Sequence, residues 1–123
     1  MPAAYTELKV RTHVVGIERL ERLRWRVSVD GRRLFINDTA RQHIRVFDVK
    51  ADGTLTGGKV WAETKGEGKG APDGMKLDAA GNVYCTGPGG IHVFSPEAVD
   101  LGVIQVPEYT ANFAWGDGDL QAL

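Results

Sequence analysis

The chain has 123 residues, of which 42% are hydrophobic and 25% charged, and its formal net charge is −1 at pH 7. These values are typical of one soluble globular domain, and the near-neutral charge argues against binding to nucleic acid or to an anionic membrane. No apolar run approaches the roughly 18 residues that span a bilayer, and residues 1–13 contain no apolar stretch of a secretory signal. Because the single cysteine, Cys85, cannot form an internal disulfide, we expect a cytoplasmic protein.

The N-terminal part of the chain follows no single pattern. Ile17, Leu20 and Leu23 are spaced three apart, as on one side of a helix, with charged residues between them. The same stretch is also compatible with the approach to a strand, because the residues after it alternate and lead into an Asp-Gly turn. We therefore expect a strand over residues 24–29 and treat residues 1–23 as an atypical N-terminal segment.

From residue 33 onward, apolar and polar residues alternate in short runs, which is the period of a half-buried strand. In HIRVFDV, for example, Ile44 and Val46 share one face and Phe47 lies on the other. Turn signals rich in glycine separate the runs, and the 16 glycines exceed the usual share of about 7%. The sequence predicts strands over residues 33–37, 43–49, 59–63, 74–78, 82–86, 90–94 and 101–106, with turns at 30–31, 52–53, 57–58, 80–82 and 88–90.

These strands form a repeat with an offset close to 50 residues. One unit runs from WRVSV to KVWAE and the next from GMKLD to LGVIQV, and each contains four strands. Four-stranded units of ~40–45 residues are typical of β-propeller blades, and closed propellers use about four to eight of them. We therefore predict an all-β partial β-propeller, one domain over 1–123, with blades at 24–64 and 70–106 and the start of a third blade at 111–123.

Two blades leave open strand edges, and open edges pair with other strands. We expect other copies of the chain to complete the ring, as a dimer or a trimer. The alternatives are a piece of a longer ancestor and a free-standing small β-sheet protein that repeats twice.

The segment GAPDGMKLDAAGNVYCTGPGGIHVF, over residues 70–94, resembles the gluconolactonase, regucalcin and luciferin-regenerating-enzyme-like family. DGRRLFINDTARQHIRVFDVKADGTL at 30–55 and ANFAWGDGD at 111–119 resemble the adjoining stretches of that family. The resemblance implies a six-bladed propeller that hydrolyses lactones of sugar acids and related esters with one divalent cation, most often calcium. It implies three cation ligands, namely a Glu of an early blade, an Asn in Pro-Asn-Gly and the Asp in Pro-Asp-Gly. The last is Asp73 here, the Asn position falls on Leu23, and the early Glu has no counterpart.

A physical argument for Asp73 stands beside the resemblance. Asp73 opens a strand behind Pro72, and strand openings converge at a propeller axis, where the equivalent positions are Leu23, Asp73 and Asn112. Calcium prefers hard oxygen ligands, so the predicted metal ligands are Asp73 and Asn112. In lactone hydrolysis the cation would polarise the carbonyl, and Asp73 would double as the catalytic base. The alternative is that Asp73 only caps a glycine turn.

The sequence thus predicts a metal-dependent sugar-lactone hydrolase whose site is incomplete in a single chain, with a small lactone or sugar acid as its ligand. The alternative is a non-catalytic propeller fragment that forms oligomers or acts as a binding module. We interpret Cys85 as a packed thiol rather than a nucleophile. His43 and His92 lie on equivalent strands, and we interpret both as outward-pointing structural side chains; His13 is isolated from them in sequence.

Overall fold

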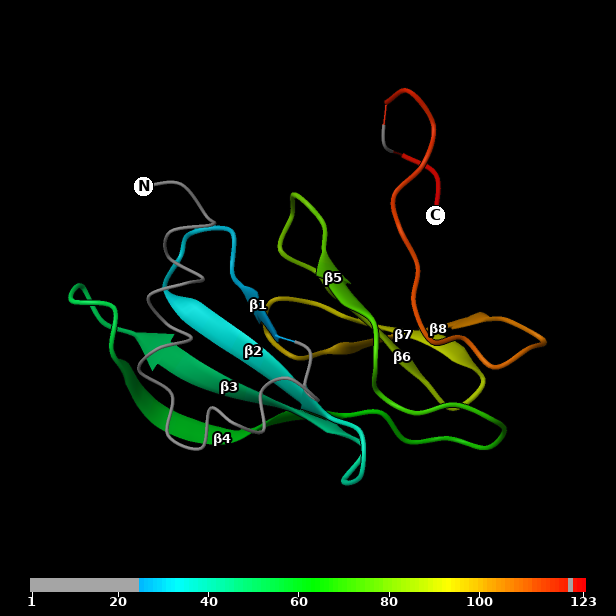
Figure 1. Ribbon diagram of the computed structural model, residues 1–123, viewed down its shortest axis with the longest axis horizontal. Coiled ribbons are helices and arrows are strands. Elements are labelled where there is room, and N and C mark those ends of the chain that lie inside the picture. Colours follow the sequence, from blue (N-terminus) through cyan, green and yellow to red (C-terminus); the bar gives the residue numbers. More distant parts are fainter. Residues whose placement is uncertain (1–24, 120) are drawn as a thin grey trace.

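The computed structural model describes residues 25–119 and 121–123 and contains eight β-strands within them (Figure 1). The first sheet is formed by β1 (Trp25–Val27), β2 (Arg33–Asp38), β3 (His43–Val49) and β4 (Leu55–Glu63). The second sheet is formed by β5 (Met75–Leu77), β6 (Val83–Gly87), β7 (Gly90–Phe94) and β8 (Asp100–Gln105).

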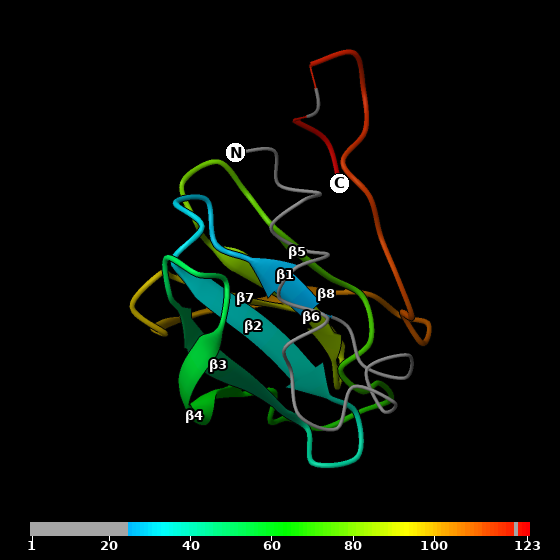
Figure 2. The same ribbon diagram turned by 60° about the vertical axis from the view of Figure 1, so that its left-hand side comes forward.

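In both sheets every pair of neighbouring strands is antiparallel, and the spatial order of the strands is their order along the chain. Figure 2 shows the two sheets lying against each other as successive layers. The predicted fold class, an all-β partial propeller, is confirmed. The predicted N-terminal segment, with Leu23 and His13, lies outside the described residues.

Tight turns connect the strands where the sequence places Asp-Gly or Ala-Gly. Gly31, Gly53 and Gly81 have φ angles of 74°, 85° and 87°, a left-handed conformation that glycine adopts without steric cost. The predicted turn at residues 57–58 is wrong, because β4 begins at Leu55 and continues through both glycines. The ladder between β3 and β4 absorbs them through register shifts, so the two glycines belong to an irregular strand rather than to a hairpin.

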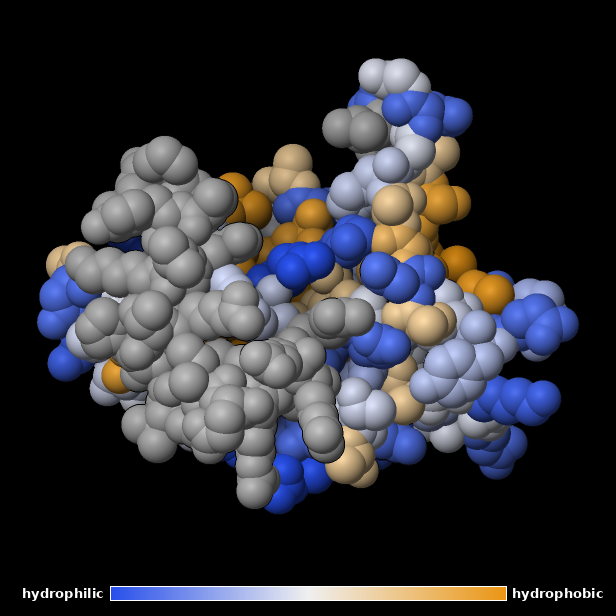
Figure 3. Space-filling model, in the orientation of Figure 1, coloured by the Kyte–Doolittle hydropathy of each residue, from blue (hydrophilic) through white to orange (hydrophobic). Residues whose placement is uncertain are grey.

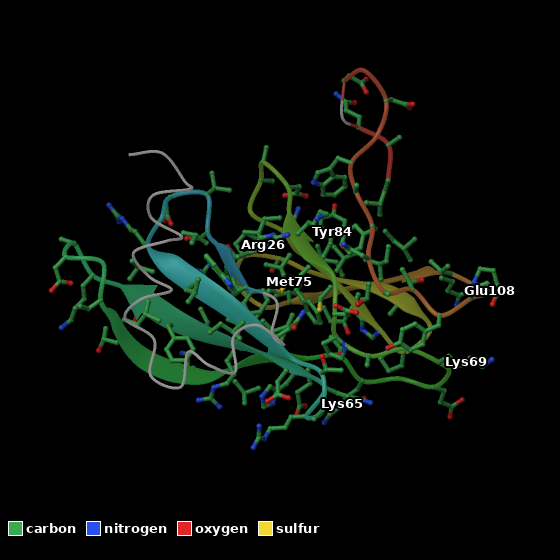
Figure 4. The ribbon with its side chains drawn as sticks, viewed as in Figure 1. Arg26, Lys65, Lys69, Met75, Tyr84 and Glu108 are labelled. Carbon is green, nitrogen blue, oxygen red and sulfur yellow. The ribbon has the colours of Figure 1, made fainter. Side chains whose placement is uncertain are left out.

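The main hydrophobic core lies between the two sheets. Trp61 joins them, since its ring is 4.8 Å from that of Phe35 and 5.9 Å from that of Phe94, both in edge-to-face geometry. Figure 4 shows Met75, on the first strand of the second sheet, pointing into this interface. The buried members of the core are Phe35, Ile44, Val46, Ala62, Met75, Val83, Cys85 and Phe94.

The opposite face of the first sheet carries a second apolar cluster. Its buried members are Leu34 and Ile36, and Trp25 and Phe47 pack against them. The strand registers explain this cluster, because Leu34 pairs with Phe47 as Val83 pairs with Phe94 in the second sheet. Each sheet therefore repeats the same side-chain pattern on the same face, as expected for layers that stack one behind another.

The prediction that His43 and His92 point outward is wrong, because their side chains are only 9% and 1% exposed. Nε2 of His92 lies 2.9 Å from the carbonyl oxygen of Pro88, and its ring stacks near Phe94. Nε2 of His43 is buried without a hydrogen-bond partner. His92 pairs with Cys85 on the face that packs into the core between the sheets, so its ring is enclosed rather than directed to solvent.

The last strand, β8, forms the outer edge of the second sheet, and all six of its residues are exposed. Leu101, Val103 and Ile104 are among the most exposed large apolar side chains. After β8, residues 107–119 and 121–123 form a segment that rises away from the sheets, here called the C-terminal arm (Figure 1). Figure 3 shows hydrophobic surface where β8 leads into this arm. Residues 25–119 and 121–123 include no helix that is long and apolar enough to cross a membrane.

Candidate active site

Asp73 lies in the connection between the two sheets, two residues before β5 begins. β5 is the first strand of the second sheet and contacts β1, the first strand of the first sheet. The two first strands therefore meet where the layers are closest, as inner strands do around a propeller axis. Within this connection, Pro72 and Gly74 are buried and Asp73 is half-buried.

The second sheet fixes the backbone of this connection through Thr86. The Thr86 hydroxyl accepts a hydrogen bond from the Asp73 amide at 2.9 Å and donates one to the Ala71 carbonyl at 3.0 Å. The Thr86 amide donates to the carbonyl of Gly74 at 3.0 Å. One residue of β6 thus ties both ends of the Pro-Asp-Gly turn.

The first sheet reaches the same connection with two side chains. The Asn37 amide nitrogen, Nδ2, donates to the Asp73 carbonyl at 2.7 Å, and the Thr39 hydroxyl donates to the Pro72 carbonyl at 2.6 Å. Asn37 Nδ2 also lies 3.6 Å from Cys85 Sγ. Sequence reasoning missed Asn37, Thr39 and Thr86. The available signal was the repeat itself, since Asn37 and Thr86 are polar residues near the ends of equivalent apolar strands.

The structure brings Asn112 to the Pro-Asp-Gly turn. The Gly74 amide donates to the Ala111 carbonyl at 2.8 Å. A Cβ on Gly74 would lie 2.5 Å from Asn112 Oδ1 and 2.8 Å from its Cα, so only glycine leaves room for the arm here. Oδ1 of Asn112 accepts the Phe113 amide at 2.9 Å, which orients the side-chain amide.

The base of the C-terminal arm packs along the second sheet. The Trp115 ring meets Tyr84 edge-to-face at 5.0 Å, and the Lys76 ammonium lies 5.9 Å from the centre of the Phe113 ring. Lys76 and Tyr84 are cross-strand partners on β5 and β6, and Figure 4 shows Tyr84 on the side of the sheet nearer the arm. These contacts hold Asn112 beside β5.

The donor chemistry fits a hard divalent cation in kind but not in number. A carboxylate at Asp73 and an amide oxygen at Asn112 are ligand types that calcium accepts, whereas calcium takes about six to eight oxygen ligands. Among the residues that the structure describes, no group of three or more His, Cys, Asp or Glu side chains is placed to hold a metal ion. The third equivalent position, Leu23, lies outside the described residues.

Cys85 lies beneath the same turn and is 0% exposed. Burial raises the pKa of its thiol to about 12, which outweighs the hydrogen bond from Asn37. The thiol is therefore neutral near pH 7 and cannot act as a thiolate nucleophile. The interpretation of Cys85 as a packed thiol is confirmed.

Two surface grooves lie away from this site. One is lined by residues of the connection after β4 and by Val103 and Gln105 to Pro107, and the other runs between Arg33, Trp61 and Glu97. Neither includes Asp73 or Asn112 among its lining residues.

Comparison with known proteins gives a consistent family. A family profile described as "SMP-30/Gluconolactonase/LRE-like region" matches residues 24–123. A gluconolactonase from Zymomonas mobilis is 32% identical over an alignment of 85 positions, which covers 63% of this chain and 24% of the relative.

Two solved structures share the fold. A gluconolactonase from Xanthomonas campestris is 27% identical with a TM-score of 0.63, and the match covers 72% of this chain and 29% of that protein. Regucalcin from Agrobacterium tumefaciens, described as a calcium-binding protein, is 25% identical with a TM-score of 0.65, covering 78% and 34% of the two chains. This chain spans about a quarter of the curated relative and about a third of the solved structures it matches.

Proposed function

The chain belongs to the SMP-30/gluconolactonase/LRE-like family, and on that premise we propose that it is part of a metal-dependent hydrolase of sugar-acid lactones. One observation carries the proposal. The Pro-Asp-Gly turn lies at the start of an inner strand, held by hydrogen bonds from both sheets and with Asn112 beside it. The lactonase names of the relatives support the reaction class, and the calcium-binding description of regucalcin supports the cation.

In this proposal Asp73 and Asn112 supply oxygen ligands to a divalent cation, with calcium the expected ion. When bound, the cation would polarise the lactone carbonyl and acidify a water molecule. The carboxylate of Asp73 takes the proton of the water that attacks the carbonyl carbon, and it returns that proton to the ring oxygen as the ring C–O bond breaks, which gives the open hydroxy acid. The remaining ligands come from outside the described residues.

The test is a lactone hydrolysis assay combined with a calcium titration of the wild-type chain and two Asp73 variants. Asp73→Ala removes the ligand and the base, and we expect it to abolish both calcium binding and turnover. Asp73→Asn keeps an oxygen ligand but has no base, so we expect residual calcium binding without turnover. Asp48→Ala, which removes an exposed carboxylate from β3, is the matched control and should leave both unchanged.

The proposal fails if wild-type protein hydrolyses no lactone and gives no calcium-dependent heat signal at millimolar calcium. The second candidate function, a non-catalytic propeller fragment that binds or assembles, would then stand. The replacement of the family's metal-binding Asn by Leu23 favours that candidate, because a leucine side chain has no oxygen to offer a cation.

We also propose that other copies of the chain complete the ring, as a dimer or a trimer, in the cytoplasm. The exposed apolar side chains of the edge strand β8 support assembly, because such edges and patches favour association. Sedimentation equilibrium should show the assembly, and a compact monomer at micromolar concentration would contradict it. The cytoplasmic location rests on the single cysteine, and cell fractionation tests it.

A further inference from the structure

We propose that Asn37, Thr39 and Thr86 form a clamp that positions Asp73 for the cation. The three are positioning residues, because they contact the backbone around Asp73 rather than the reacting atoms. The inference rests on the proposed function, since it assigns the clamp a role in cation binding at the same site.

Thr86 is the central member of the clamp. Its side chain is 0% exposed, yet its hydroxyl makes two hydrogen bonds, one from the Asp73 amide and one to the Ala71 carbonyl. A buried hydroxyl costs free energy unless it is paired, so both bonds constrain where the turn can lie. The turn therefore cannot shift along β6 without leaving a buried polar group unsatisfied.

Asn37 and Thr39 hold the turn from the neighbouring sheet. Asn37 is 0% exposed and donates to the carbonyl of Asp73, while Thr39 donates to the carbonyl of Pro72. The backbone of Asp73 is thus bonded at its amide by one sheet and at its carbonyl by the other. Fixing both groups fixes the peptide planes on either side of the residue, and with them the direction of the bond from Cα to Cβ.

The registers of the two sheets show that the clamp is built from the repeat. Asn37 pairs with Ile44 on β3, and Thr86 pairs with Ile91 on β7, so the two polar residues occupy equivalent positions. Thr86 serves the turn of its own sheet, whereas Asn37 reaches across to the turn of the next sheet. The direction of Asp73 therefore depends on how the two layers are stacked.

The neutral thiol of Cys85 completes the surroundings of the turn. Asn37 Nδ2 faces both the Asp73 carbonyl and Cys85 Sγ, so the amide side chain is held between them. Cation affinity depends on such outer hydrogen-bonding partners, and removing one typically costs about 10–100-fold.

The experiment compares two fully buried threonines. Thr86→Val removes the hydroxyl of the clamp, and Thr64→Val removes an equally buried hydroxyl that donates to the Gln42 carbonyl at 3.2 Å. Thr86→Ser retains the hydroxyl and serves as the rescue variant, and Asn37→Ala removes the bond from the other sheet. The readouts are calcium affinity by titration calorimetry, the melting temperature, and amide hydrogen exchange at Asp73 in metal-free protein.

We expect Thr86→Val and Asn37→Ala to weaken calcium binding by about tenfold or more, while Thr86→Ser and Thr64→Val stay within about twofold of wild type. We expect the two valine variants to lose similar amounts in melting temperature. The Asp73 amide should nevertheless exchange faster in Thr86→Val than in Thr64→Val. Equal calcium affinity and equal Asp73 exchange in Thr86→Val and Thr64→Val would overturn the clamp. Wild-type protein without calcium binding would instead overturn the proposed function, and the exchange comparison would still decide whether Thr86 fixes the turn.

Discussion

Ile44 on β3 and Ile104 on β8 are the same side chain on similar alternating strands, yet Ile44 is 0% exposed and Ile104 is 43% exposed. Ile44 faces the second sheet and joins the core between the layers, whereas Ile104 lies on the outer edge strand. The contrast separates the face that a residue occupies from the burial of that face, which alternation in the sequence does not distinguish. Sequence period decides which face a residue occupies, and the stacking of a second sheet decides whether that face is buried.

The largest effect is expected when a side chain is removed from the core between the two sheets. Phe35→Ala removes a ring that is 0% exposed and packs against Trp61, so we expect a loss of about 3–5 kcal/mol in the free energy of unfolding. Urea denaturation measures it. Tyr109→Ala, which removes a ring that is 53% exposed, is the control and should cost far less. Similar losses in both variants would show that the interface is not the main core.

A smaller effect is expected where two glycine segments cross. Gly70 has a φ of 137°, and a Cβ there would overlap the Gly87 carbonyl oxygen. Gly70→Ala should therefore destabilise the protein by about 1–3 kcal/mol, because the backbone must move to relieve the overlap. Gly68→Ala is the matched control, since Gly68 also has a positive φ but its Cβ would lie 3.5 Å from the nearest backbone atom. Equal melting temperatures for the two variants would contradict the predicted overlap.

The valine and serine variants of Thr86 and the Asp73 variants extend the comparison to the Pro-Asp-Gly segment before β5. Here the sequence predicted that Asp73 and Asn112 occupy equivalent strand openings, because motif and repeat both mark those positions. It did not predict the clamp. Asn37, Thr39 and Thr86 act through backbone atoms of a turn that lies far away in sequence or in the other sheet, and alternation carries no information about such contacts.

The two histidines and the glycine pair show the same limit from another side. The pattern placed His43 and His92 on defined faces, but it did not indicate that both side chains are buried, at 9% and 1% exposure. Gly57 and Gly58 read as a turn, but in the structure Gly58 has Phe47 so close that a Cβ would lie 2.6 Å from its ring. The glycine there makes room for an aromatic side chain within the sheet.

A pH-dependent effect of intermediate size is expected at the hairpin after β5. Burial opposes ionisation of Asp78, but hydrogen bonds from Asn82 and Tyr84 outweigh it and hold its pKa below the ordinary 3.8. The stabilisation is therefore present above about pH 4 and is lost as the pH falls through the lowered pKa.

Urea unfolding at pH 7 and pH 3 tests this. The difference in unfolding free energy between wild type and Asp78→Asn should shrink at pH 3, because that pH lies below the ordinary pKa of 3.8 and part of the stabilisation by the carboxylate is lost. Tyr84→Phe removes one of the donors and should show a smaller change of the same sign. A difference between wild type and Asp78→Asn that does not vary with pH would rule out the carboxylate as its source.

The smallest effect is expected at the outer edge. Ile104→Thr keeps the branched side chain on β8 and should change the free energy of unfolding by no more than about 0.5 kcal/mol in dilute solution. Ile44→Thr makes the same change at 0% exposure and should cost several times more, because it buries a hydroxyl in the core. A large loss in Ile104→Thr that grows with protein concentration would place β8 in an interface between copies.

The coincidence of chain order and spatial order in both sheets has a consequence for how such a protein can change over time. Every ladder joins strands that are consecutive in sequence, so copying or deleting a stretch of one repeat length adds or removes a whole layer without cutting any other ladder. A gene for this architecture can therefore gain or lose one four-stranded sheet at a time. What must be rebuilt after each event is only the handful of contacts that pass from one layer to the next, such as the bond from Asn37 to Asp73.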